Sequence, residues 1–481
     1  MRLTMLPRLL LLASAALALR PASQVHLALT NDVQSCANGV AISFASATPD
    51  PYHVHYAPAG STETWVVSTR PSSSYSVAHG RYHYASPHLH TAYLCKLLPN
   101  TEYTYTIHNG DKNSSFFTPP AVGDDTPTVL SVVGDPGDTT ESSATLEMLA
   151  APINGLHPHA LLVAGDYAYA NGEHEIWDRW FQLQEGVFRS VPTLGIPGNH
   201  ETVVGSGHAA PRPLAWDMLG ENYLGYLQRV VTPLTPESIA AKRTYYSFDV
   251  GLVHLVFLDD YVGSVGSATN SVGTAAWLSA RTRQLTWLAN DLGRVDRNKT
   301  PWVVVIKHNP YYNTWQDHQC QCSHARFEIA DPDACWRGVY VKGHPMFEPH
   351  CGLQAKLEPL YAQFGVDVVL AGHVHGYERT APIYQNKIDE AKGTVYVTTG
   401  AGGNYEGHAG PRLPGPLPPW SLAVNNQVYG ASKLIATRTS LEILWLTNKD
   451  HATPHDRAVL PLRSPGSPTM KHMTKRVIVA P

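Results

Sequence analysis

The sequence has few charged residues and no second long apolar run. Only 15% of its 481 residues are charged, and the net charge at pH 7 is -4. A charge this small excludes a strongly basic or acidic surface, so we expect no nucleic-acid partner. Beyond the N-terminal segment no stretch is long enough to cross a bilayer, and no internal repeat is present. The apolar content of 43% is ample for large cores, and the length predicts two or three domains.

The N-terminus has the features of a secretory signal. Arg2 and Arg8 supply positive charge, residues 9–19 form an apolar core, and residues 16–18 fit a cleavage motif. We therefore predict a signal peptide over residues 1–18, cleaved between about residues 18 and 23, and a secreted or lumenal protein without a membrane span. Asn113 and Asn298 lie in sequons and are candidate glycosylation sites.

Six cysteines, an even number, favour disulfides in an oxidising compartment. Their pairing cannot be read from the spacing, so it is left open for Cys36, Cys95, Cys320, Cys322, Cys335 and Cys351. The last four could instead form a zinc site, although they lack the paired C-x-x-C spacing. Histidines near them that could contribute are His324, His344 and His350.

Two regions of the chain differ in their pattern. Residues 24–118 contain short alternating strands separated by turn residues, which is typical of a β-sandwich. In residues 125–463 strands alternate with helices predicted at 140–150, 177–184 and 275–292. This alternation predicts βαβ units, with a largely parallel core sheet covered by helices. The polar segment 464–481 is predicted to be a disordered tail.

Candidate ligands follow five predicted strands of the second region. In chain order, the motifs are Gly134-Asp135-Pro136-Gly137, Gly165-Asp166 with Tyr169, Gly198-Asn199-His200-Glu201, Lys307-His308-Asn309-Pro310 and Gly372-His373-Val374-His375. A single Gly-Asp pair is usually a turn, and a single His-x-His pair usually lies on the surface. Parallel sheets collect ligands at the carboxyl ends of their strands, so we expect the five motifs to meet at one edge of one sheet.

The residue types in these motifs divide into two sets that suit two metal ions. Asp135, Tyr169 and His375 form the harder, more anionic set, which suits a trivalent ion. A neutral set that suits a divalent ion consists of Asn199, His308 and His373, and Asp166 can bridge the two ions.

This series of motifs resembles the calcineurin-like metallophosphoesterases, and Tyr169 together with the N-terminal sandwich resembles the large plant- and fungal-type purple acid phosphatases. Supporting stretches are residues 245–249, 295–297, 300–302, 376–379 and 399–404. The resemblance implies an α/β protein, in which a fibronectin III-like sandwich precedes a metallophosphoesterase β-sheet sandwich flanked by helices. It also implies Fe(III) at the anionic set and Zn(II), Mn(II) or Fe(II) at the neutral set.

The same resemblance implies a secreted acid phosphatase that hydrolyses phosphomonoesters, with metal-bound hydroxide as the nucleophile. Asn199, His200 and His318 would contact the substrate phosphate, and a protonated histidine, His200 or His318, would donate to the leaving group. Its partners would be small phosphorylated substrates, with a homodimer left open. The alternatives are a phosphodiesterase or pyrophosphatase on the same site and, in another class, a non-catalytic secreted binding protein.

Two positions depart from the family pattern. Asp317 stands where large members carry the first of two adjacent histidines, and it would either weaken phosphate binding or point away from the site. Tyr311 stands where the family usually has Trp, a change of one aromatic packing group for another. Residues 319–350 follow directly, and we expect them to form a disulfide-tied flap at the mouth of the site.

Overall fold

The protein is described by a computed structural model over residues 22–30, 36, 39–79, 81–107, 113–202, 221–234, 238, 240–241, 243–264, 272–320, 322–339 and 348–463. The predicted signal peptide, the predicted tail and His344 lie outside these residues. Within them, no helix combines the length and apolarity that a membrane crossing requires.

The N-terminal region is built from short strands, as its alternating pattern predicts. One sheet has the order β4-β3-β8-β9 and faces the strands β1, β2 and β7, while β5 and β6 form a separate hairpin. Alternate side chains of β8, such as Tyr103 and Tyr105, are buried in the core of this sandwich. The bounds are β1 Ser23–Thr30, β2 Gly39–Ser46, β3 His53–Pro58, β4 Trp65–Ser68, β5 Ser76–His79, β6 Tyr82–Ala85, β7 His88–Leu94, β8 Glu102–Ile107 and β9 Ser114–Phe117.

The second region contains two sheets, as the family resemblance implies, so the single core sheet expected from the alternation of strands and helices is wrong. The first has the order β24-β23-β22-β10-β11-β12 and continues into β1-β2-β7 through the pairing of Ala28 with Thr193, which makes nine strands. Its bounds are β10 Thr128–Val133, β11 Ala160–Ala164, β12 Thr193–Ile196, β22 Gly430–Ala436, β23 Ser440–Thr447 and β24 Asp456–Pro461. Strands β10, β11 and β12 are parallel.

The second sheet has seven strands in the order β13-β14-β15-β16-β20-β17-β21, and β14, β15, β16 and β20 are parallel. Its bounds are β13 Tyr246–Val250, β14 Val253–Phe257, β15 Trp302–Lys307, β16 Val368–Ala371, β17 Tyr377–Thr380, β20 Val395–Thr399 and β21 Ser421–Asn425, beside a small pair formed by β18 Ile383–Tyr384 and β19 Lys387–Ile388. Alternate side chains of the two sheets, such as Val132 and Val304, share one core.

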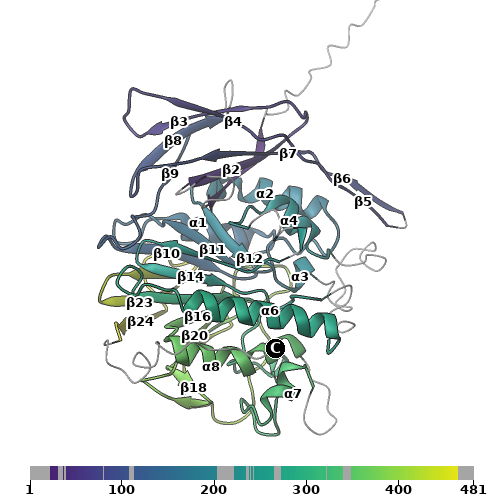
Figure 1. Ribbon diagram of the computed structural model, residues 1–481, viewed down its shortest axis with the longest axis vertical. Coiled ribbons are helices and arrows are strands. Elements are labelled where there is room, and N and C mark those ends of the chain that lie inside the picture. Colours follow the sequence, from purple (N-terminus) through teal and green to yellow (C-terminus); the bar gives the residue numbers. More distant parts are fainter. Residues whose placement is uncertain are drawn as a thin grey trace, which may run out of the picture.

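Helices cover the outer faces of both sheets (Figure 1). Their bounds are α1 Thr140–Ala150, α2 Glu175–Phe188, α3 Asn199–Thr202, α4 Leu224–Arg229, α6 Ala275–Leu292, α7 Pro332–Trp336 and α8 Gln354–Phe364, with 3-10 turns η2 Gln316–His318 and η3 Pro349–Leu353. Helices α1 and α2 pack on the first sheet, and α6 and α8 on the second. Thr139 caps α1 by accepting a hydrogen bond from Ser142 N. The layers are therefore helix, sheet, sheet, helix.

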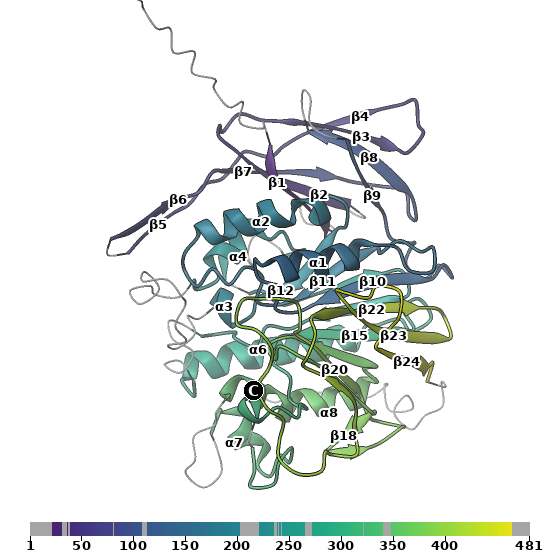
Figure 2. The same cartoon turned by 180° about the vertical axis from the view of Figure 1, so that it is seen from behind.

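The N-terminal sandwich lies against α2 and α4, at the opposite end of the molecule from α7 and α8 (Figures 1 and 2). A polar seam joins the two regions. The buried Arg229 donates to Tyr75 OH, Gln24 Oε1 and Asp178 Oδ1 at 2.9 to 3.0 Å. Tyr82 OH donates to the carboxylate of Glu175 at 2.7 Å. The sandwich thus contacts the helices that cover the first sheet.

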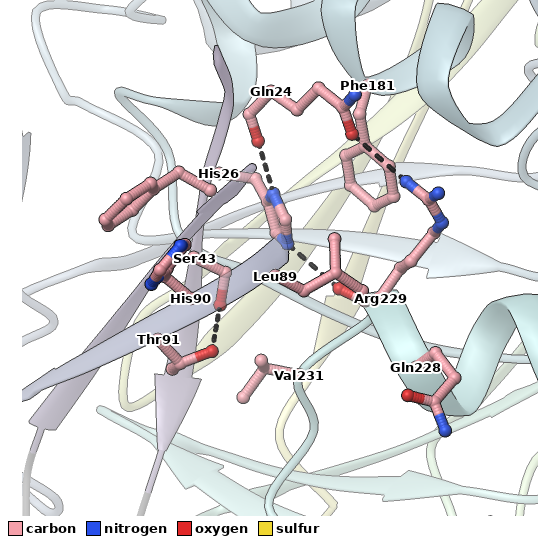
Figure 3. A pocket seen from close by; sticks show the side chains of 11 residues that line it. Gln24, His26, Ser43, Leu89, His90, Thr91, Phe181, Gln228, Arg229 and Val231 are labelled. Carbon is pink, nitrogen blue, oxygen red and sulfur yellow. Dashed lines mark hydrogen bonds between the residues drawn. The ribbon is translucent and has the colours of Figure 1, made fainter. Parts of the chain in front are cut away.

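A cavity of about 30 Å³ lies in this seam (Figure 3). His26 lines it with both ring nitrogens near carbonyl oxygens, Nδ1 2.7 Å from Gln24 O and Nε2 2.9 Å from Arg229 O. Burial lowers the pKa of His26 to about 4, so the ring is neutral and only one of these contacts is a hydrogen bond at a time. The cavity has room for about two water molecules.

All six cysteines form disulfides. The pairs are Cys36–Cys95, Cys320–Cys351 and Cys322–Cys335. A disulfide sulfur is not a thiolate ligand, so the alternative zinc site built on the last four cysteines is excluded. The expectation of disulfides is confirmed, and the structure supplies the pairing that the spacing left open.

Candidate metal centre

The five motifs lie at the carboxyl ends of strands from two different sheets. Strands β10, β11 and β12 of the first sheet are followed by Asp135, Asp166 and Asn199, whereas β15 and β16 of the second sheet are followed by His308 and His373. The expectation of a single sheet edge is therefore wrong, but the motifs still meet because the two sheets stack face to face. The candidate site lies where three strand ends of one sheet face two of the other.

The Tyr169 side of the site brings together three candidate ligands. The hydroxyl of Tyr169 lies 3.2 Å from Asp135 Oδ1 and 3.0 Å from His375 Nε2. His375 Nε2 is 3.6 Å from the same Asp135 oxygen. A carboxylate, a phenol and an imidazole nitrogen thus converge on one point, and they include the two oxygen donors that a hard ion prefers.

The Asn199 side brings together an amide oxygen and two imidazoles. Asn199 Oδ1 lies 3.0 Å from His308 Nε2 and 3.0 Å from His373 Nδ1. The other nitrogen of His308 lies 2.7 Å from Ala164 O, which fixes the ring so that Nε2 faces the site. One ring nitrogen from each histidine is therefore available to an ion beside Asn199 Oδ1.

Asp166 lies between the two sides. Its Oδ2 is 3.1 Å from His308 Nε2, and its Oδ1 accepts a hydrogen bond from His200 N at 2.9 Å. The buried Tyr169 phenol has a pKa well above its ordinary value because of burial and because the Asp135 and Asp166 carboxylates lie close to it. Asp166 thus contacts His308 of one donor set, and its charge acts on Tyr169 of the other.

The backbone at the site is strained. Among the seven candidate ligands, Asp135, Asp166, Tyr169 and His373 have left-handed backbone, with φ between 54° and 67°. Such conformations cost about 1 to 3 kcal/mol each and cluster at functional sites. The glycines make the close approach possible. A Cβ at Gly198 would lie 2.1 Å from Asp166 Oδ1, and a Cβ at Gly165 would lie 2.4 Å from His308 Nδ1.

Glu201 holds two of the ligand loops together, a role that the sequence analysis missed. Its buried carboxylate accepts hydrogen bonds from Asp166 N, Tyr167 N and Gly198 N at 2.8 to 2.9 Å. Burial and the neighbouring Asp166 carboxylate raise the pKa of Glu201 well above its ordinary value. The position of Glu201 in the same motif, directly after Asn199-His200, was the signal that the sequence offered.

His200 lies over the Tyr169 ring, with the ring centroids 4.1 Å apart. Its Nδ1 donates to Asn171 Oδ1, and its Nε2 is 3.8 Å from Glu406 Oε1 and 3.9 Å from Asp166 Oδ2. Asn171 and Glu406 were missed by the sequence analysis. Asn171 fixes the His200 ring, and Nε2 is the nitrogen that points toward Asp166.

The carboxylate of Glu348, which the sequence analysis missed, lies beside His318. Oxygen Oε1 of Glu348 lies 3.2 Å from His318 Nδ1 and 3.0 Å from His373 Nε2. Burial alone would raise the pKa of Glu348, but His373 and His318 outweigh it and hold that pKa well below its ordinary value. Asp317 is exposed and lies beside the Gly410 backbone, outside the cluster that Glu348 forms.

The charges of the site fit bound cations. Burial alone would lower the pKa of His308, but the Asp166 carboxylate outweighs it and raises that pKa to about 10. Burial would likewise lower the pKa of His375, but the Asp135 carboxylate outweighs burial and raises that pKa. Without ions, protons on these imidazoles balance the carboxylates. Metal ions bound at these side chains would take the place of the protons, so the donor set suits cations.

Comparisons with known families extend the likeness to most of the chain. The calcineurin-like phosphoesterase family matches residues 129–377, and the family described as iron/zinc purple acid phosphatase-like protein C matches residues 393–457. Purple acid phosphatase 22 of Arabidopsis thaliana is 32% identical over 68% of this chain. The match spans 62% of that relative's length. The phosphoenolpyruvate phosphatase of Allium cepa is 31% identical over 82% of this chain and 75% of its own length.

Two solved structures resemble the fold. Purple acid phosphatase PPD1 from yellow lupin seeds has a TM-score of 0.66 at 21% identity, over 92% of this chain and 74% of its own. The structure of PhoD has a TM-score of 0.58 at 12% identity, over 92% of this chain and 89% of its own. At these identities the likeness concerns the fold alone, and it confirms the expected sandwich followed by stacked sheets with flanking helices.

Proposed function

Since this chain belongs to the purple acid phosphatases, within the calcineurin-like phosphoesterases, we propose that it hydrolyses phosphomonoesters at a centre of two metal ions. The observation that carries the proposal is the convergence of two donor sets on either side of Asp166. Tyr169 OH lies within 3.2 Å of Asp135 and His375, and Asn199 Oδ1 lies 3.0 Å from His308 and His373.

The donor types assign a different ion to each side. Fe(III) suits the side formed by Asp135, Tyr169 and His375, because a carboxylate and a phenolate are hard anionic donors. Zn(II), Mn(II) or Fe(II) suits Asn199, His308 and His373, which are neutral, and Asp166 would be shared. When bound, the two ions would polarise the phosphate and lower the pKa of a water molecule.

The remaining polar side chains handle the substrate. His200 has Nδ1 engaged by Asn171, so Nε2 is left to contact the phosphate or the leaving group. When both ring nitrogens are protonated, Nε2 carries a proton for the leaving oxygen. His318 stands on the Asn199 side, with its ring 5.3 Å from that of His373, and serves as a second phosphate contact.

One observation favours a second candidate function, the hydrolysis of phosphodiesters. Glu348 and Glu406 both lie within 4 Å of site histidines. Repulsion by these carboxylates rises with the charge of the substrate, and a phosphodiester carries less charge than a phosphomonoester. These carboxylates therefore reduce the preference for phosphomonoesters over phosphodiesters.

Secretion is supported by the three disulfides, which persist in oxidising compartments. Asn113 and Asn298 are exposed, as glycan attachment requires, and we include both as glycosylation sites. A shift in mass on enzymatic deglycosylation of the secreted chain tests both sites together.

The function is tested by measuring kcat/KM for p-nitrophenyl phosphate and for its bis(p-nitrophenyl) diester with the metal-loaded protein. We expect the monoester to be the better substrate. Asn199→Ala should lower kcat/KM by about 10²-fold or more and remove one ion, because it deletes a donor where charge develops. Hydrolysis of neither ester by the wild-type protein contradicts the proposal. Faster hydrolysis of the diester selects the second candidate.

A further inference from the structure

The two histidines that flank the Asn199 side share one carboxylate, that of Glu348. His373 faces Asn199 with Nδ1 and Glu348 with Nε2, both at 3.0 Å. A carboxylate that accepts from the far nitrogen of a metal-binding imidazole fixes the tautomer and the orientation of the ring. Glu348 Oε2 also lies 3.4 Å from Asn309 Nδ2, beside the ligand His308. Glu348 therefore supports the Asn199 side from behind.

Glu348 does not belong to any of the five strand-end motifs. Glu348 stands 30 residues after His318, and a disulfide closes this excursion of the chain at its base. Cys320 lies two residues after His318, and Cys351 lies three residues after Glu348. The Cα atoms of the two cysteines are 5.9 Å apart. The cross-link thus joins the two chain segments that carry His318 and Glu348.

The disulfide also contacts Glu348 directly. The carbonyl oxygen of Glu348 lies 2.8 Å from Cys351 Sγ and 3.7 Å from Cys320 Sγ. A buried guanidinium fixes the same end of the excursion, because Arg281 of α6 donates to His350 O at 2.8 Å and to Trp336 O at 2.6 Å. These contacts leave the Glu348 backbone little freedom relative to the site.

We propose that the Cys320–Cys351 disulfide is a positioning cross-link, which holds Glu348 against His373 and so strengthens retention of the ion on the Asn199 side. This proposal rests on the proposed function, since it requires that His373 binds an ion. The Tyr169 side has no contact with Glu348 among the described residues, so its ion does not depend on the cross-link. The two sides of the site therefore differ in their sensitivity to breakage of this disulfide.

The same excursion supplies a matched control, the disulfide Cys322–Cys335. Its cysteines are 13 residues apart, against 31 for Cys320–Cys351, and both bonds are buried. Within the described ranges, no hydrogen bond or ion pair joins Cys322 or Cys335 to Glu348, His318 or His373. Removal of this second cross-link loosens the excursion without releasing Glu348.

The experiment compares C320S/C351S, C322S/C335S, E348Q and the combination of the first and third with the wild-type protein. Each protein is loaded with iron and zinc and dialysed against a series of EDTA concentrations, and the ions per chain are counted by mass spectrometry. The visible absorption band reports the Tyr169 side separately, and the melting temperature reports folding.

We expect C320S/C351S and E348Q each to lose one ion at an EDTA concentration about 10 to 100-fold lower than the concentration that the wild type requires. A loss of metal affinity of this size is usual when a residue that supports a metal ligand is removed. The combined variant should lose it no more readily than either alone, because both changes remove the same contact. C322S/C335S should retain both ions as the wild type does, and all variants should keep the visible band.

Equal ion retention by C320S/C351S and C322S/C335S would overturn the proposal. So would wild-type retention in E348Q, which leaves both disulfides intact and decides the matter if C320S/C351S does not fold. If the wild-type protein holds two ions and E348Q retains them equally well, the positioning role of the disulfide is wrong but the proposed function stands. A wild-type protein that binds no ions removes the proposed function with it.

Discussion

The Tyr169 side and the Asn199 side of the candidate centre differ in what surrounds their ligands. Asp135, Tyr169 and His375 contact one another at 3.0 to 3.6 Å, and all three belong to short loops after strands. On the other side His373 is backed by Glu348, which the chain delivers after an excursion closed by a disulfide. The candidate ligands of one side contact one another, whereas a ligand of the other side is held by a carboxylate from a distant segment.

This difference teaches that a ligand set and its support need not come from the same part of the chain. Strands β10, β11, β15 and β16 fix where the ligands stand, because strand ends in stacked sheets cannot move independently. The orientation of an imidazole ring is a finer property, set by what its second nitrogen contacts. For His308 that contact is the carbonyl of Ala164, but for His373 it is the side chain of Glu348.

The largest effect is expected from Asp166→Asn, which would abolish the difference between the two sides because it damages both. Loss of the shared carboxylate should remove both ions and lower kcat by at least about 10³-fold. Metal analysis and a phosphomonoester assay measure this. Asp249→Asn, at a carboxylate that is 43% exposed and pairs with His254, is the control and should change neither quantity. A variant at position 166 that keeps both ions contradicts the bridging role.

A selective effect is expected from Tyr169→Phe, which deletes the only phenol among the candidate ligands. The visible band that a tyrosinate gives on iron should disappear completely, because no other ligand of the set can supply it. The ion on the Asn199 side should stay, since none of its candidate ligands is altered. Absorption spectra and ion counts of the two proteins decide this, and a band that survives in the variant sinks the assignment of Tyr169.

A smaller effect is expected from Asn171→Ala, which frees the His200 ring without touching a candidate ligand. General acid catalysis contributes about 10² to 10⁴-fold, so partial misorientation of His200 should lower kcat by about 10-fold with both ions retained. Tyr405→Phe removes only the 3.3 Å hydrogen bond that Asn171 donates to Tyr405, and should stay within about two-fold of wild type. Equal kcat values for Asn171→Ala and the wild type would show that Asn171 does not orient His200 for catalysis.

No effect on the site is expected from a change at His254, which is buried away from the candidate ligands and pairs with Asp249 and Asp291. Burial alone would lower its pKa, but Asp249 and Asp291 outweigh it and raise the pKa to about 9. The folded pKa lies above the unfolded value of about 6.5, so the stabilisation is complete below pH 6.5 and is lost as the pH rises through 9.

His254→Gln should therefore lower the free energy of unfolding by on the order of 3 kcal/mol at pH 6 and by much less at pH 10. Denaturant unfolding at the two pH values measures this, with ion content as the check that the site is intact. If His254→Gln lowers the free energy of unfolding equally at both pH values, the pairs with Asp249 and Asp291 do not stabilise the fold electrostatically.

The convergence of the five motifs in the candidate site could be predicted from the sequence because its candidate ligands follow apolar strands at short, regular spacing. Asp166 and His308 come directly after β11 and β15, and a strand end is a fixed position in space. The expectation of one sheet failed because the strand pattern gives the type of each element but not its partners. Which strand pairs with which is decided by long-range contacts such as that of Ala28 with Thr193.

Glu348, Asn171 and Glu406 could not be predicted for a related reason. Glu348 stands 25 residues before His373 in a segment without periodicity, and only the folded chain brings the two together. The disulfide pairing was open because Cys322–Cys335 is nested inside Cys320–Cys351, an arrangement that the spacing does not distinguish from its alternatives. Glu201 was within reach, since it stands two residues after Asn199.

The central claim, that two unlike ions are held on either side of Asp166, is tested most directly by metal analysis of the purified wild-type protein together with its visible spectrum. The account predicts two ions per chain, one of them iron, and an absorption band that Tyr169→Phe abolishes. A protein that binds no ions, or a single ion without a visible band, would contradict it.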